Sequence, residues 1–405
     1  MSNFFAHISP ENRARLDELF SDITDRSGEV APISADERAA RRERLGALLR
    51  KRGLDAFVIE PGTTMTYLTG VGWESWERLF ALVVTADGEL FWICPNFESS
   101  RARIMAEEPG GEIVTWEENE YPYAPLAAAF ASRRVERVAL EPWLRLRFAD
   151  GIASAHGRER VEVGQDLLVE LRGRKDEHEI SILRHANEFT QEAICKVART
   201  LEPGATTSEI AMRLTVAQER MGLTGIWNLS LIGPAGAFPH GEDRERTLED
   251  GDVLLVDTGG KLHGYGSDNT RTWAQGGRPS ERFSGIWHTV RDAQKAAFEA
   301  IRPGAACRTV DEAARAVIDA SGYGSGYEVF THRLGHGIGL DGHEDPYFDG
   351  GSSVPMEAGM TFSNEPGIYL PGEFGVRVED IVAVTEDGAD HFGSWQAGPE
   401  SPDPR

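Results

Sequence analysis

Cysteine is scarce in this sequence. The 405 residues include three cysteines, Cys94, Cys195 and Cys307, which lie far apart and form no CxxC pair. This spacing indicates neither a disulfide framework nor a metal site built on thiolates. We therefore expect a protein of the reducing cytoplasm.

Long apolar runs are missing as well. No stretch approaches the roughly 20 apolar residues that a membrane-spanning helix needs. Residues 1–12 do not combine a basic start with an apolar run, which is the pattern of a secretory signal. The sequence therefore predicts neither secretion nor membrane insertion, and we expect no membrane partner.

Acidic residues outnumber basic residues in this sequence. Lysine and arginine total 42 against 66 aspartates and glutamates, which gives a formal net charge of −24. Such a field repels the phosphates of nucleic acid, whereas it admits divalent cations and small zwitterions such as peptides. Nucleic acid is therefore not an expected partner.

What the sequence contains is enough for two folded domains. A chain of 405 residues exceeds the size at which one hydrophobic core stops growing. Its first part combines a helical pattern at residues 36–52 with short apolar runs at 55–59, 80–84 and 90–93. Strands that alternate with helices predict an α/β domain, which we assign to residues 1–168.

A second domain is predicted over residues 169–405. It opens with a helical pattern, in which apolar residues recur between 180 and 197. Two Pro-Gly-Ala turns, at 203–205 and 303–305, each follow one predicted helix and precede another. This echo suits a domain built from two related halves with a site between them, although two unrelated turns would give the same letters.

Two aspartates of this domain stand at a predicted hairpin. The apolar run 253–256 predicts a buried strand that ends on Asp257. The chain turns at 263–266 and returns as a strand, whose alternation puts Asp268 and Thr270 on one face. Tips of strands often carry ligands, but each aspartate taken alone is more typical of a turn or a cap.

Histidines cluster further along the chain. Of its 11 histidines, His332, His336 and His343 lie close together among several glycines. Glycine lets backbone approach a ligand closely, and neutral imidazole is a common ligand for borderline metals. A lone histidine would more often be structural, but this density indicates a site.

Two glutamates complete the set. Pro366 holds the preceding Glu365 extended, unlike a helical surface glutamate. Alternation over 376–379 places Arg377 and Glu379 on one side of a predicted strand, and a surface ion pair is the alternative interpretation. Four carboxylates with one imidazole suit two divalent ions, whereas the same cluster buried without cations would be strongly unfavourable.

Five ordered motifs resemble those of the Xaa-Pro dipeptidases (prolidases) and Xaa-Pro aminopeptidases of the pita-bread metallopeptidase group. The motifs lie at 256–259, 264–272, 335–340, 364–369 and 376–380. The resemblance is strong over residues 171–395 and looser before them. It implies a creatinase-type α/β N-terminal domain followed by an α+β pita-bread catalytic domain with pseudo-twofold halves.

The same resemblance implies a set of metal ligands. Asp257 would bind one ion, His336 and Glu365 would bind the other, and Asp268 with Glu379 would bridge them. A hydroxide bridging the two divalent metals would then hydrolyse the Xaa-Pro peptide bond, chiefly in dipeptides. Manganese is the expected metal, with cobalt or zinc as alternatives.

Further roles follow from the same resemblance. The resemblance implies Glu365 as the acceptor of the nucleophile's proton, His343 as the residue that stabilises the tetrahedral intermediate, and His240 as a histidine on the substrate side. It also implies that Arg377 and His332 bind the substrate, and the Arg377 guanidinium suits a carboxylate. None of the five ligand positions is missing.

A homodimer is the assembly that the resemblance implies. In related enzymes the N-terminal domain helps to wall the neighbour's active site, and the aromatic stretch 72–78 is the candidate wall here. The alternative activities are an Xaa-Pro aminopeptidase acting on longer peptides and a related amidase acting on a small non-peptide amide. A non-enzymatic binding module is disfavoured, because such modules usually lose these ligands.

Overall fold

The computed structural model describes residues 8–242 and 244–404. Within them the chain forms two compact units. One unit spans residues 33–172, and the other combines the segment up to Pro32 with the residues from Gly173 onward. The sequence pattern, in contrast, predicts one domain over residues 1–168 and a second over residues 169–405.

The segment that precedes Pro32 packs on residues that follow Gly173, through contacts that the sequence alone does not reveal. Asp22 pairs with Lys196 at 2.7 Å. The ring of His263 lies 2.9 Å from the carbonyl oxygen of Val30. These partners are more than 170 residues away along the chain, so they become neighbours only in the folded protein.

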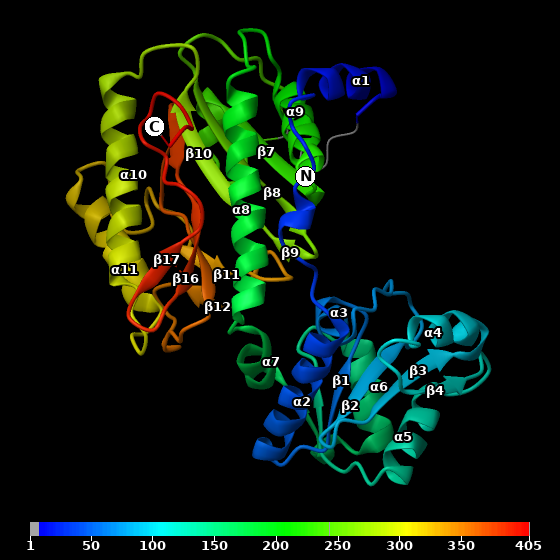
Figure 1. Cartoon of the computed structure of the whole chain (residues 1–405). Helices are drawn as coiled ribbons and strands as arrows, with labels where there is room; N and C mark the ends of the chain where they lie inside the picture. Colours follow the sequence, from blue (N-terminus) through cyan, green and yellow to red (C-terminus); the bar gives the residue numbers. More distant parts are fainter. Residues whose placement is uncertain (1–7, 243, 405) are drawn as a thin grey trace. The chain divides into compact units, whose positions relative to one another are not determined.

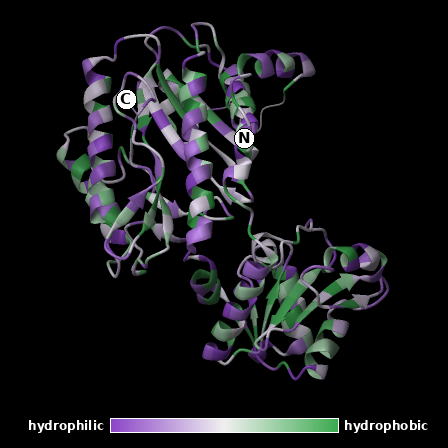
Figure 2. Ribbon diagram, viewed as in Figure 1, coloured by the Kyte–Doolittle hydropathy of each residue, from purple (hydrophilic) through white to green (hydrophobic). Residues whose placement is uncertain are grey.

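The unit of residues 33–172 is built around a six-stranded sheet of order β4-β3-β2-β1-β5-β6 (Figure 1). Its central strands are strongly apolar (Figure 2), because helices cover the sheet. The predicted α/β class is thereby confirmed. The strands are β1 (Ala56–Ile59), β2 (Ala81–Thr85), β3 (Leu90–Pro95), β4 (Glu112–Trp116), β5 (Val138–Leu140) and β6 (Val161–Val163). The helices are α2 (Ala35–Arg52), α3 (Thr63–Thr69), η2 (Asn96–Glu98), α4 (Ser99–Met105), α5 (Tyr123–Ser132), α6 (Leu146–His156), η3 (Arg158–Arg160) and α7 (Gln165–Arg172).

The second unit contains two helix pairs, each followed by antiparallel strands. The N-terminal segment adds α1 (Pro10–Leu19) and η1 (Ser27–Glu29). The first half holds α8 (Glu177–Ala198), α9 (Thr207–Arg220), β7 (Thr224–Ile232), η4 (Gly233–Ala237), β8 (Val253–Leu262), β9 (Tyr265–Gly266) and β10 (Asn269–Ala274). The second half holds α10 (Glu281–Ala300), α11 (Arg308–Ala320), β11 (Gly335–Gly337), β12 (Glu344–Phe348), β13 (Thr361–Asn364), β14 (Gly367–Leu370), β15 (Phe374–Arg377), β16 (Asp380–Val384) and β17 (Ala389–His391). In the described part of the chain, no helix has the length and apolar character to cross a membrane.

The two Pro-Gly-Ala turns occupy equivalent places in the two halves. Gly204 has φ +98° and donates its N–H to the carbonyl of Leu248 at 2.8 Å. Gly304 has φ +83° and donates to the carbonyl of Met356, also at 2.8 Å. Leu248 precedes β8 and Met356 precedes β13 by the same five positions. This correspondence confirms the predicted two-halved domain.

A glycine lets β11 approach β13 closely at the centre of the second half. A Cβ atom added to Gly335 would lie 1.9 Å from the carbonyl oxygen of Ser363. No side chain tolerates that distance, so any larger residue at 335 would push the two strands apart.

Gly335→Ala is therefore expected to lower the free energy of unfolding by about 2 kcal/mol or more, the usual scale of overpacking in a closed core. Denaturant unfolding of the purified variant measures this. Gly28→Ala is the matched control, because a Cβ there meets nothing within 4 Å. An unfolding midpoint for Gly335→Ala equal to that of Gly28→Ala would show that β11 and β13 move apart without a loss of stability.

Candidate functional site

Two aspartates of the first half meet on one hairpin. Asp257 lies on β8 opposite Thr270 of β10, and Asp268 immediately precedes β10. The N–H of Asp268 donates to the side-chain oxygen of Asn187 on α8 at 3.1 Å. The ladder between β8 and β10 and this bond from α8 hold both carboxylates beside each other.

The second half supplies the other donors from three short strands. His336 lies at the middle of β11, Glu365 immediately follows β13, and Glu379 immediately precedes β16. Strands β13 and β16 pair with Asn364 opposite Asp380, so the two glutamates stand at the same end of the sheet. Nε2 of His336 lies 3.4 Å from a carboxylate oxygen of Glu365.

These donors form overlapping groups. Oxygens of Asp257, Asp268 and Glu379 all lie within 4.8 Å of one another, and so do single donor atoms of His336, Glu365 and Glu379. Glu379 belongs to both groups, and Nε2 of His336 also lies 3.7 Å from Asp268. The structure thus brings together all five residues that the sequence analysis named as ligands.

The electrostatics of this cluster indicate a site for cations. Burial, together with neighbouring carboxylates, raises the pKa of Asp268 and of Glu379 well above their ordinary values. Burial also raises the pKa of Glu365 to about 7. Oδ1 of Asp257 is buried without a hydrogen-bond partner among the described residues. Divalent cations would offset this repulsion, and oxygen-rich donor sets with one imidazole suit them.

His336 fits the same role. Its burial, with the nearby His343, lowers its pKa to about 3, so the imidazole is neutral at physiological pH. The neutral ring is the form that ligates metals.

Two hydroxyl groups orient the glutamates, and the sequence analysis did not assign them a role. Oγ1 of Thr270 donates to Oε2 of Glu379 at 2.7 Å. Oγ of Ser363 donates to Oε1 of Glu365 at 3.0 Å and accepts the N–H of His336 at 2.9 Å. For Thr270 a signal existed, since strand alternation placed it on the face of Asp268.

His343 lies over the ligand cluster and remains exposed to solvent. Its ring stacks on that of His336, with centroids 3.6 Å apart and an interplanar angle of 11°. Partial burial and the charge of Arg333 lower its pKa. A neutral, accessible imidazole at this position can donate a hydrogen bond to a bound substrate.

Arg377 contacts the ligand cluster from a buried position. Its Nη2 pairs with Oδ2 of Asp257 at 2.6 Å, and its Nε donates to Oγ1 of Thr270 at 3.1 Å. Its Nη1 donates to the hydroxyl of Tyr369 at 2.9 Å and to the carbonyl of Pro239 at 3.2 Å. Arginine carries five N–H donors, so one hydrogen on Nη2 has no acceptor among the described residues.

The remaining predicted residues line the same region. Nε2 of His332 lies 2.7 Å from the hydroxyl of Tyr369, which connects His332 to Arg377. His240 is exposed on the loop that Arg377 holds through Pro239, and it lies near enough to His332 to affect that residue electrostatically. Tyr369 ends the 364–369 motif, but the motif alone does not indicate its contacts with His332 and Arg377.

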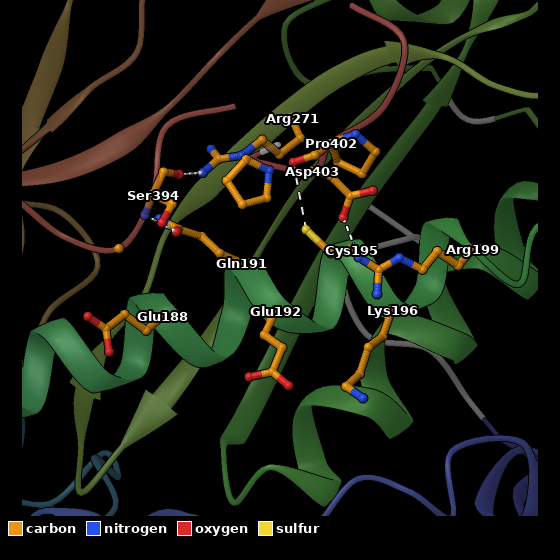
Figure 3. Close-up of a pocket in the computed structure, with 12 residues that line it drawn as sticks. Glu188, Gln191, Glu192, Cys195, Lys196, Arg199, Arg271, Ser394, Pro402 and Asp403 are labelled. Atoms are coloured by element: carbon orange, nitrogen blue, oxygen red, sulfur yellow. Dashed lines mark hydrogen bonds and ion pairs between the residues drawn. The ribbon is translucent and has the colours of Figure 1, made fainter. Parts of the chain in front are cut away.

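A separate cavity of about 430 Å³ lies between α8 and the C-terminal segment (Figure 3). Its basic groups are already paired: Arg199 contacts Asp403 at 2.6 Å, Lys196 contacts Asp22 at 2.7 Å, and Arg271 contacts Asp380 at 2.6 Å. These pairs satisfy the groups that a polar ligand would need. The cluster around Glu379 is therefore the better candidate for chemistry.

Known proteins share both units. Residues 41–173 match the Creatinase/Prolidase N-terminal domain, and residues 181–386 match Metallopeptidase family M24. A probable dipeptidase PepE from Mycobacterium tuberculosis is 38% identical over 360 residues, which cover 88% of this chain and 94% of that protein. An Xaa-Pro dipeptidase from Lactobacillus delbrueckii is 33% identical, over 86% of this chain and 95% of that protein.

A solved structure agrees with these matches. The dipeptidase PepE from Mycobacterium ulcerans superimposes with a TM-score of 0.84 at 34% identity, over 92% of this chain and 99% of that one. The fold expected from the sequence, a creatinase-type domain followed by a pita-bread catalytic domain, is confirmed by this likeness and by the two domain matches. The chain belongs to metallopeptidase family M24.

Proposed function

We propose that this protein is a dinuclear metallopeptidase that hydrolyses the Xaa-Pro bond, with dipeptides as its preferred substrates. The observation that carries the proposal is the convergence of Asp257, Asp268, His336, Glu365 and Glu379 from both halves of the unit. The Lactobacillus delbrueckii relative, which is named an Xaa-Pro dipeptidase, supports the substrate class.

The proposed ligand arrangement follows the two overlapping groups. Asp257 would hold one ion, His336 and Glu365 would hold the other, and Asp268 with Glu379 would contact both. Two divalent ions bound there would acidify a water molecule and polarise the scissile carbonyl. The oxygen-rich set favours manganese, with cobalt and zinc as alternatives.

The chain's own residues supply the proton transfers and the positioning. Glu365, whose carboxylate stands beside His336 within the ligand cluster, would accept a proton from the nucleophile. His343 would donate to the oxyanion of the tetrahedral intermediate from its stacked position over His336. His240 would contact the substrate from the loop that Arg377 holds through Pro239.

Recognition of a short substrate would rest on Arg377 and His332. The remaining N–H on Nη2 of Arg377 can reach a substrate carboxylate only if that carboxylate lies close to Asp257. A free proline carboxylate would meet this requirement, whereas an amidated or extended chain would lose the charge-assisted bond.

A homodimer in the cytoplasm is part of the proposal. In the stretch 72–78, Trp73 stacks on Phe80 with centroids 4.0 Å apart, but Trp76 is 55% exposed. Phe97, close by beneath Arg78, is 61% exposed. Exposed aromatic clusters of this kind mark interaction surfaces. The three cysteines are unpaired, which fits a reducing compartment.

A substrate panel tests the activity. With added Mn²⁺, an Xaa-Pro dipeptide should have a higher kcat/KM than the same dipeptide amidated or extended by several residues, and a chelator should abolish turnover. Arg377→Ala should reduce that preference. Equal or faster cleavage of the extended peptide would replace the dipeptidase with an aminopeptidase, and cleavage restricted to non-peptide amides would favour the amidase alternative.

His343→Ala should lower kcat by about 100-fold, the scale of a lost oxyanion donor, while Mn²⁺ content and unfolding temperature stay near those of the wild type. Steady-state kinetics and elemental analysis measure both. His288→Ala is the control, because His288 is exposed on α10 and contacts its own helix. Turnover equal to that of the control would reduce His343 to a packing role.

Light scattering at micromolar concentration should show two chains per particle. Trp76→Ser should shift the protein toward monomers, because it removes exposed apolar surface. Val163→Ser is the matched control, since Val163 is 68% exposed on β6, an edge strand of the six-stranded sheet of the 33–172 unit. A wild-type protein that is strictly monomeric and fully active would remove the dimer from the proposal.

A further inference from the structure

Asp380, the residue after Glu379, is buried within a polar cluster behind the site. Its Oδ1 contacts Nη2 of Arg271 at 2.6 Å and accepts a bond from Gln191 at 3.1 Å. Its Oδ2 accepts a bond from Gln294 at 3.0 Å. These three partners come from β10, α8 and α10, so this single carboxylate gathers elements of both halves.

Arg271 holds two consecutive residues at once. While Nη2 contacts Asp380, Nη1 donates to the backbone carbonyl of Glu379 at 2.7 Å. The N–H of Glu379 in turn donates to the carbonyl of Thr270, next to Arg271, at 3.0 Å. The peptide groups on both sides of Glu379 are thereby fixed to β10, which follows directly on Asp268.

Gln294 makes a corresponding link to the other glutamate. Its Nε2 donates to Oδ2 of Asp380 and also to the backbone carbonyl of Asn364 at 3.2 Å. The side-chain amide of Asn364 returns a bond to the carbonyl of Gln294 at 2.9 Å. Asn364 precedes Glu365, so one amide connects the backbone beside Glu365 to the backbone beside Glu379.

From this geometry we infer that Arg271 and Gln294 are positioning residues, which hold the backbones of Glu379 and Glu365 in register with Asp268. The inference rests on the proposed function, because it assigns these residues to the geometry of a metal site. Neither side chain is among the five ligands, and both are buried.

Stability alone does not account for the cluster. The side chains of Arg271 and Asp380 are 2% and 1% exposed, and replacing a buried ion pair with apolar residues is often neutral or stabilising. Burial by itself would raise the pKa of Asp380, but the charges of Arg271 and His391 outweigh it, so the pKa is lowered and the carboxylate stays ionised. The ion pair orients the backbone, because the planar guanidinium of Arg271 donates to Asp380 and to the carbonyl of Glu379 in fixed directions.

The outer side of the cluster faces the cavity beside α8. Figure 3 shows Arg271, Gln191 and Ser394 together on its wall. Nη2 of Arg271 donates to the carbonyl of Ser394 at 3.1 Å, and the N–H of Ser394 donates to Gln191 at 2.9 Å. A lysine at position 271 would keep the positive charge, but an ammonium group cannot reproduce the fork.

Arg271→Lys and Gln294→Met test the inference in the full-length protein. After removal of metals, calorimetric titration with Mn²⁺ should show Kd values raised about tenfold to 100-fold, the scale seen for residues that orient ligands. In loaded protein, kcat should fall while KM changes little. Arg213→Lys is the matched control, because Arg213 is a buried arginine of α9 that pairs with Glu209 at 2.9 Å and donates to the carbonyl of Thr200.

The outcomes separate this inference from the proposed function. If the wild type binds two Mn²⁺ and cleaves dipeptides while both variants match Arg213→Lys in Kd and kcat, the positioning roles are wrong and the function stands. If the wild type binds no Mn²⁺, the function fails and the inference fails with it. Should Arg271→Lys not fold, Gln294→Met decides, since it keeps the ion pair of Arg271 and Asp380. It removes the side-chain amide, whose oxygen also accepts a bond from Arg291 at 2.7 Å.

Discussion

Carboxylates that repel one another dominate this structure. Burial and the charge of neighbouring carboxylates, Asp257 among them, raise the pKa of Asp268, Glu365 and Glu379. Carboxylates buried in this way stay ionised together only where positive charge offsets their repulsion. Arg377 supplies part of that charge through Asp257, and divalent cations are the natural source of the rest. Neutral groups complete the cluster: the hydroxyl of Thr270 donates to Glu379, and the hydroxyl of Ser363 accepts the N–H of His336.

The two-halved architecture is the means by which these donors meet. In each half a glycine turn of positive φ joins the two helices of the pair, and each turn is bonded to the chain just ahead of a strand that leads to the site. The first half contributes two aspartates from one hairpin, and the second half contributes two glutamates and a histidine from the ends and middle of short strands. Neither half could assemble the set alone.

The sequence predicted the parts of this site that depend on local pattern. Strand alternation, glycine placement and the five motifs were sufficient to name the cluster residues and the two-halved fold. They could not identify the partner of Arg377, because alternation placed it beside Glu379 while folding brings it to Asp257, 120 positions away. Tyr369 and Gln294 were missed for the same reason: their contacts, to His332 and to Asp380, exist only between segments distant in sequence.

The segment before Pro32 belongs to the second unit although the 33–172 unit follows it in the chain. During synthesis, the sheet of the 33–172 unit has all its strands as soon as residue 172 has left the ribosome, since domains fold as units from the N-terminal side. The first segment must wait longer, because its partners on α8 and at the β8–β9 turn have not yet been made. In a nascent chain this segment therefore stays undocked while the 33–172 unit completes its sheet, and the unit that bears the proposed metal ligands is the last to fold.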